Sequence, residues 1–120
     1  MPGGAAVIVL PWPPTVNTYY RNVHGRTLIS AKGREYRQAV AELAADQNWP
    51  KFGNKRVSVQ IEAWMPDKRR RDLDNILKSA LDSLTHAGVW DDDCQIDGLA
   101  IWRAPLLGGM CKVDIKEIQP

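Results

Sequence analysis

Two aspartates and one lysine stand at a spacing that suits metal-assisted chemistry. Asp72 and Asp74 are separated by a single leucine, and Lys78 follows Asp74 by four residues. Three arginines, at 69–71, come directly before the first aspartate. Carboxylate oxygens are preferred ligands of Mg²⁺ and Mn²⁺, and a guanidinium group can bind a phosphate through two parallel hydrogen bonds. The stretch therefore indicates a site where a divalent metal meets a polyanion.

Each of these residues also has an ordinary structural explanation, which stays open here. If a helix begins near Asp72, that aspartate can cap free backbone N–H groups, and Asp74 in the first turn is favoured by the helix dipole. A surface ion pair between Asp74 and Lys78 would contribute only about 0.3–0.5 kcal/mol, so it explains little. A basic run such as 68–71 is commonly no more than a solvated loop.

A second group of acids follows further along the chain. Asp91, Asp92 and Asp93 are adjacent, and adjacent like charges lower stability unless water, bases or a cation compensate them. If their loop folds back beside Asp72, the carboxylates form an oxygen-rich metal site. In phosphodiester hydrolysis such a metal lowers the pKa of the attacking water and stabilises the leaving oxygen, and Lys78 would stabilise the developing negative charge. The sequence leaves the convergence of the two loops undecided.

The elements that must position these residues follow from the hydrophobic pattern. A short apolar strand at 5–10 is stopped by Pro11, and residues 17–29 are expected to form a loop or an irregular hairpin. Ser30 is a suitable N-cap for a first helix, whose apolar residues recur every three or four positions. Residues 57–65 alternate between apolar and polar side chains, which indicates a half-buried strand.

The second helix has the clearest periodicity. Its apolar stripe consists of Leu73, Ile76, Leu77, Ala80, Leu81 and Leu84. Gly88 is the expected stop of this helix. Two further strands are expected at about 96–103 and 110–118, with a turn at Gly108 and Gly109. The order β-α-β-α-β-β predicts an α+β fold, in which a mixed sheet of about four strands packs against two main helices.

Length and composition are typical of one small domain spanning residues 1–120. The chain is 44% hydrophobic and 25% charged, with a net charge of +2, and its bases gather at 68–71 and 21–37. No apolar run reaches the roughly 20 residues of a membrane span, and the start lacks the basic region of a signal peptide. Cys94 and Cys111 have no metal-binding spacing, so we expect reduced thiols and a cytoplasmic location.

Two stretches of the sequence resemble one known family. They are LPWPPTVNTYYR (Leu10–Arg21) and MPDKRRRDLDNILKSALDSLTHAGVWDDD (Met65–Asp93), the second with the spacing D-x-D-N-x-x-K followed by Gly-x-Trp-x-Asp-Asp. Both are similar to the RusA family of Holliday junction resolvases, small nucleases common in bacterial prophages. The resemblance implies a Mg²⁺-dependent homodimer, with Mn²⁺ as an alternative metal. Such a dimer binds four-way DNA junctions and nicks two opposing strands symmetrically, in DNA recombination and repair.

The family motif also implies roles for individual residues. Asp72, Asp74 and Asp93 would be the catalytic carboxylates and metal ligands, and Lys78 the basic catalytic residue beside them. Next to such a site, the basic residues of the preceding loop are expected to bind DNA phosphates. These residues are Lys68, Arg69, Arg70 and Arg71.

Two alternatives stay open beside the nuclease. A protein that binds branched DNA without cutting it would use the same basic loop, with the acids as helix caps and solubilising groups. A metal-dependent hydrolase of nucleotides would need a Gly-rich loop that cradles phosphate, and the sequence contains none. One departure from the family pattern is Asp91, an acid where a neutral residue is usual, so Asp91 and Asp92 also compete for a place at the metal site.

Overall fold

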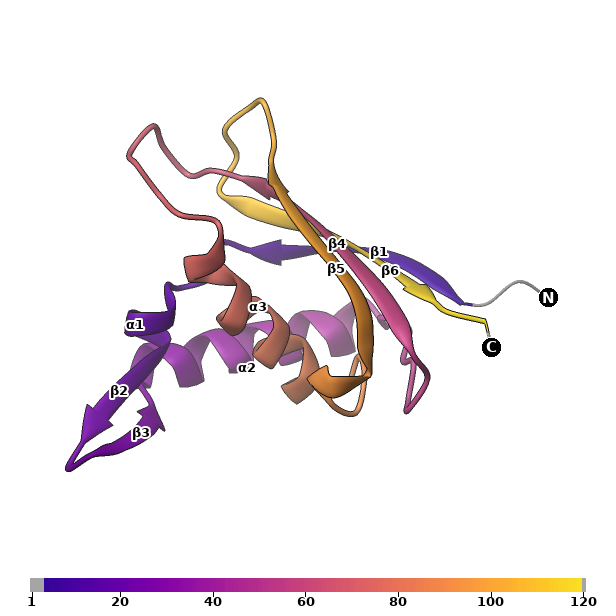
Figure 1. Cartoon of the computed structure of the whole chain (residues 1–120), viewed down its shortest axis with the longest axis horizontal. Helices are drawn as coiled ribbons and strands as arrows, with labels where there is room; N and C mark the ends of the chain where they lie inside the picture. The colour runs from indigo at the N-terminus through magenta and orange to yellow at the C-terminus, as the bar shows by residue number, and fades with distance from the viewer. Residues whose placement is uncertain (1–3, 120) are drawn as a thin grey trace.

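The structure is a computed structural model that describes residues 4–119. In chain order its elements are β1 (Ala5–Pro11), α1 (Val16–Tyr19), β2 (Tyr20–Val23), β3 (Arg26–Ile29), α2 (Ala31–Asp46), β4 (Val57–Trp64), α3 (Asp74–His86), the short 3-10 helix η1 (Asp93–Gln95), β5 (Ile96–Arg103) and β6 (Met110–Glu117). The main sheet has the strand order β1-β6-β4-β5, in which β4 and β5 are parallel and the other neighbours are antiparallel. Figure 1 shows α2 and α3 side by side on one face of this sheet.

The face of the sheet under the two helices forms the core. Along β4 every second residue is buried, namely Val57, Val59, Ile61 and Ala63. The α3 side chains directed to this core are buried as well: Ile76, Ala80, Leu81 and Leu84. Apolar side chains at a period of two on the strand and at a helical period on α3 meet in one layer. The expected α+β fold, with a mixed four-stranded sheet packed against two main helices, is therefore confirmed.

The two main helices begin in different ways. Ser30 caps α2, because its hydroxyl oxygen accepts a 2.9 Å hydrogen bond from the backbone N–H of Gly33. Helix α3 begins at Asp74, and Leu73 before it already has helical dihedral angles and provides no side-chain cap. The interpretation of Asp72 as the cap of α3 is therefore wrong, and its carboxylate is exposed. No helix between residues 4 and 119 is long and apolar enough to cross a membrane.

Residues 16–29 form the short helix α1 and a two-stranded hairpin, β2–β3. Of the two expectations for this stretch, a loop or an irregular hairpin, the hairpin is correct. The hairpin turns at His24 (φ 51°) and Gly25 (φ 77°), and two consecutive positive φ angles are the geometry of a tight two-residue turn. At its base Tyr19 is fully buried, with 0% of its surface exposed. The hairpin is thus anchored to the core through α1.

The connection from β5 to β6 crosses the end of β4, because β4 lies between those two strands in the sheet. The loop from β4 to α3, residues 65–73, leaves from this same end. Figure 1 shows both loops beside each other at the top of the molecule. One end of the sheet therefore carries the basic loop, the first aspartates and the β5–β6 loop.

Candidate active site

The loop between β4 and α3 brings an aspartate and two arginines to one groove. The groove has a volume of about 300 Å³, and it is lined by Trp12, Thr15, Arg70, Arg71, Asp72, Asn75 and Ile76. Part of its wall is the proline-rich segment 11–15, which α3 holds through a 2.6 Å hydrogen bond from the Ser79 hydroxyl to the Pro14 carbonyl oxygen. The two stretches that resemble the known family, one at each side of the groove, therefore come together in space.

Asp72 and Asp74 present two uncompensated carboxylates at the start of α3. Both are exposed, as is Lys78 one turn further along the helix. Among residues 4–119 no ion pair involves either aspartate, and Lys78 does not pair with Asp74. Proteins bind Mg²⁺ through one or two carboxylates together with waters and substrate phosphates. The donor set at this helix start fits such a metal.

The arginines of the loop pair with a different acid, Asp67. Its carboxylate accepts hydrogen bonds from Arg71 Nη2 at 2.9 Å, from Arg69 Nε at 3.2 Å and from the Arg69 backbone N–H at 3.0 Å. These bonds, that from Arg71 above all, hold the pKa of Asp67 below its usual range. Asp67 therefore shapes the loop and offsets part of its charge, whereas Lys68 and Arg70 form no ion pair within the described residues. The Asp-x-x-x-Arg spacing was the signal that sequence reasoning overlooked.

Arg71 links three segments of the chain. Its guanidinium lies over the ring of Trp12, with 5.9 Å from Cζ to the ring centroid. Its backbone oxygen accepts a 3.0 Å hydrogen bond from Arg103 Nη2 at the end of β5. Its Nε atom is buried and has no hydrogen-bond partner within residues 4–119, so an unused donor stays beside the groove. Arg103 adds a cation beside Arg71, and it reaches this position because β5 pairs with β4.

Asp93 lies at the opposite end of α3. Its Oδ1 accepts hydrogen bonds from the Thr85 hydroxyl and, at 3.3 Å, from Trp90 Nε1. Thr85 comes eleven residues after Asp74, which is about 16 Å at 1.5 Å per helical residue. Within residues 4–119 no three His, Cys, Asp or Glu side chains are close enough to hold a metal ion together. The structure does not bring Asp93 to Asp72 and Asp74 in one chain.

The other two acids of this run are used differently. Asp92 caps η1, because its Oδ1 accepts a 2.9 Å hydrogen bond from the backbone N–H of Cys94 while Gln95 Oε1 bonds back to the Asp92 N–H. The Cys94 N–H keeps the pKa of Asp92 below its usual range. Asp91 is exposed, and its backbone N–H binds the Gly53 oxygen at 3.1 Å. Asp93 is thus the member of the run that a buried tryptophan orients.

Comparison with known proteins decides the family. A family model described as Endodeoxyribonuclease RusA matches residues 11–116. The chain belongs to the RusA family. The crossover junction endodeoxyribonuclease RusA of Escherichia coli (strain K12) is 44% identical over 112 residues, which cover 92% of this chain and 93% of the relative. The proteins of the same name from Enterobacteria phage 82 and Enterobacteria phage HK97 are 44% and 42% identical over the same shares.

One polar cluster of this RusA family member lies beside the candidate site and escaped sequence reasoning. Asp82, two turns after Asp74 on α3, accepts hydrogen bonds from the Tyr19 hydroxyl and, at 2.6 Å, from Arg37 Nη2. Arg37 Nε also donates to the Tyr19 hydroxyl oxygen at 2.8 Å. The three side chains join α1, α2 and α3, and Tyr19 is a fully buried core residue.

The electrostatics of this cluster follow from partial burial. Burial of Asp82 acts to raise its pKa, but the hydrogen bonds from Tyr19 and Arg37 outweigh it and leave the pKa below its usual range. Burial first, and the bond to Asp82 next, raise the pKa of Tyr19 to about 12. Asp82 is therefore a charged residue at neutral pH that holds α3 against α1 and α2.

Proposed function

We propose that this RusA family member is a metal-dependent endodeoxyribonuclease that resolves four-way DNA junctions. The observation that carries the proposal is the exposed Asp72, Asp74 and Lys78 at the start of α3, beside a groove lined by Arg70 and Arg71. This arrangement occurs in a chain that is 44% identical to a crossover junction endodeoxyribonuclease over 92% of its length. Since the relatives come from bacteria and their phages, we place the activity in the cytoplasm, in recombination and repair.

In this proposal Asp72 and Asp74 hold Mg²⁺, with Mn²⁺ as the alternative. When bound, the metal lowers the pKa of the attacking water and stabilises charge on the leaving oxygen. Lys78 lies four residues after Asp74 and so shares its face of α3. From that face its ammonium group stabilises the negative charge that develops on the phosphoryl oxygens.

The basic loop holds the DNA backbone beside these carboxylates. Lys68 and Arg70 are exposed and bind phosphates directly, whereas Arg69 and Arg71 share their charge with Asp67. Phosphate contacts fix the register of a protein on DNA without reading its sequence. The loop therefore positions a strand over the helix start.

We further propose that the enzyme is a homodimer whose carboxylates are shared between subunits. Asp93 is the third acid that the family motif implies, but it lies about 16 Å along α3 from Asp74 in the same chain. If two copies of α3 lie antiparallel about a two-fold axis, the last turn of one helix lies beside the first turn of the other. Asp93 of a second copy then completes the site of Asp72 and Asp74. The same symmetry creates a second site, which suits two symmetric incisions in opposing strands.

A labelled synthetic four-way junction tests this function. We expect the protein to nick two opposing strands with Mg²⁺ or Mn²⁺ and to bind the junction without nicking it in EDTA. Asp74→Asn should keep binding and lose cleavage, because it removes a metal ligand but preserves the shape of the side chain. A protein that binds the junction equally well in both buffers and leaves it intact is a non-catalytic binder, and this result would overturn the proposal.

A further inference from the structure

Two leucines stand exposed at the tip of the β5–β6 loop. Leu106 has 64% and Leu107 has 51% of its surface exposed. Isolated exposed apolar residues are normal on protein surfaces, but these two are adjacent and at the end of a protrusion. No part of the mechanism proposed above uses them.

The loop that carries the leucines is fixed to β4 by its backbone. The Ala104 N–H binds the Ala63 oxygen at 2.9 Å, and the Gly109 N–H binds the Trp64 oxygen at 2.8 Å. Gly109 has a φ of +70°, which favours glycine. A Cβ atom on Gly108 would lie 3.2 Å from Trp64 Cβ, so this loop approaches the strand more closely than most residues allow. The leucines are therefore held outward by an anchored turn.

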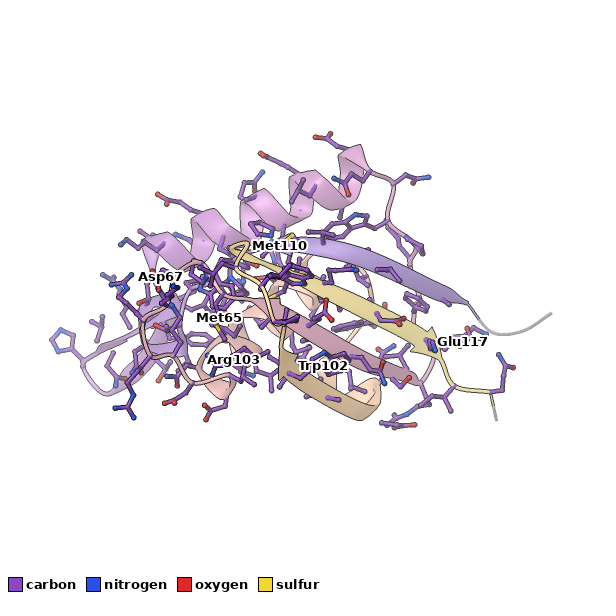
Figure 2. The ribbon with its side chains drawn as sticks, turned by 90° about the horizontal axis from the view of Figure 1, so that it is seen from above. Met65, Asp67, Trp102, Arg103, Met110 and Glu117 are labelled. Carbon is purple, nitrogen blue, oxygen red and sulfur yellow. The ribbon has the colours of Figure 1, made fainter. Side chains whose placement is uncertain are left out.

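Cationic residues lie at the base of this loop because of the sheet order. The Gly108 N–H binds the oxygen of Met65, the residue from which the basic loop 65–73 departs. On the other side, the Arg103 guanidinium at the end of β5 binds the Arg71 oxygen. Figure 2 shows Met65, Arg103 and Met110 grouped at one end of the sheet, with Glu117 at the other. A protruding apolar tip with cationic side chains near its base is complementary to nucleic acid, because the phosphates are negatively charged and the faces of the nucleobases are apolar.

We propose that Leu106 and Leu107 form a wedge that inserts against the base pairs at the branch point of a DNA junction. Apolar side chains inserted between base steps partly unstack them, which costs free energy in continuous duplex. In an open four-way junction the base pairs at the branch point stack on one side only, so the wedge meets less resistance there than in continuous duplex. The wedge thus selects branched DNA, whereas the basic loop binds any backbone. The inference rests on the proposed function, and it names the residues that recognise its substrate.

The test uses the double variant Leu106→Thr/Leu107→Thr and a matched control. The control is Val7→Thr/Val9→Thr, which removes two apolar side chains of similar exposure, 64% and 45%, from the open face of the sheet. Binding is measured in EDTA, on a four-way junction with 2-aminopurine at the branch point and on duplex DNA of equal length. We expect the original protein to raise 2-aminopurine fluorescence when it binds the junction. The loop variant should lose this rise, and its preference for junction over duplex should fall about tenfold. The control and Leu106→Met/Leu107→Met should behave as the original protein does.

Each other outcome overturns the wedge in a recognisable way. Unchanged preference and fluorescence in the loop variant would show that the tip does not touch the branch point. Equal losses on junction and duplex would make it a general DNA contact, and a monomer by light scattering, where the original protein is a dimer, would make it a subunit contact. If the original protein itself neither prefers nor cuts the junction, the proposed function fails and the wedge with it. If the original protein cuts the junction normally, a negative result with the loop variant contradicts the wedge alone and leaves the proposed function intact.

Discussion

Mixing two inactive variants distinguishes a site shared between subunits from a site within one chain. Asp74→Asn removes an acid at the first turn of α3, and Asp93→Asn removes the acid held by Thr85 at the last turn. These turns are about 16 Å apart along one helix. When the site is shared, Asp74 and Asp93 of the same chain therefore belong to two different sites of the dimer. We expect each variant alone to be inactive and their mixture to recover cleavage.

The size of the recovery follows from symmetry. In a shared site, Asp74 of one subunit works with Asp93 of the other. A mixed dimer then has one site with both substitutions and one site with neither. Random exchange makes about half of the dimers mixed, so about a quarter of all sites are intact. Because a mixed dimer has a single working site, its products are single nicks rather than paired cuts.

The assay combines the variants at equal concentration, after unfolding and refolding together to exchange subunits, and follows nicking of a labelled junction. Original protein mixed with Asp74→Asn is the control, since random exchange should leave about half of its sites intact. A mixture of Asp74→Asn and Asp93→Asn without activity, beside an active control, would refute the shared site. Recovery with paired cuts would also contradict it, because no mixed dimer has two working sites.

Three other predictions concern stability and the orientation of the acids. Asp82→Asn should lower the free energy of unfolding by about 2 kcal/mol at pH 7, because it weakens charge-assisted hydrogen bonds. The pKa of Asp82 is lowered from its ordinary 3.8, so this stability is present above that pH and is lost as the pH falls below it. The free energies of unfolding of the original protein and the variant, measured by urea titration, should therefore differ least in acid. Thr85→Val should reduce junction cleavage with unchanged binding, because Asp93 loses a donor at Oδ1. Gly33→Ala should cost about 1–3 kcal/mol by thermal unfolding, because its Cβ would lie 2.7 Å from a neighbouring isoleucine and clash with a backbone oxygen, whereas Gly98→Ala, with 3.7 Å to its nearest neighbour, should cost less.

The parts of the fold that could be predicted are those that a local pattern determines. Residues 57–65 and the stripe of α3 reach the core because their apolar residues recur at the period of a strand or a helix. Ser30 could be recognised as a cap because the cap bond joins residues only three apart. Asp72 did not follow the same rule, because the turn before α3 takes helical angles one residue early, at Leu73. Caps depend on such dihedral angles, and residue types alone do not give them.

The arrangement of side chains around the candidate site could not be predicted from the sequence. Asp82 meets Arg37 and Tyr19 across 45 and 63 residues of sequence, so no spacing rule reveals the cluster. The place of Asp93 is likewise set by distant contacts, because Gln95 binds the oxygens of Gly53 and Lys55 at 2.7 and 2.6 Å. These bonds hold the loop after α3 at the far end of the helix, away from the first aspartates.

The proposed division of the site between the two ends of α3 has a consequence for selectivity. A single chain has the basic loop and two carboxylates, so it can bind a DNA backbone and recruit a metal, but it lacks the third acid. In the proposed dimer cleavage requires two subunits, and two sites related by symmetry suit a four-way junction, whose opposing strands are cut symmetrically. Under this proposal the exposed leucines of the β5–β6 loop find no branch point in duplex DNA. Dimerisation and branch recognition would therefore act together to restrict where the DNA is cut.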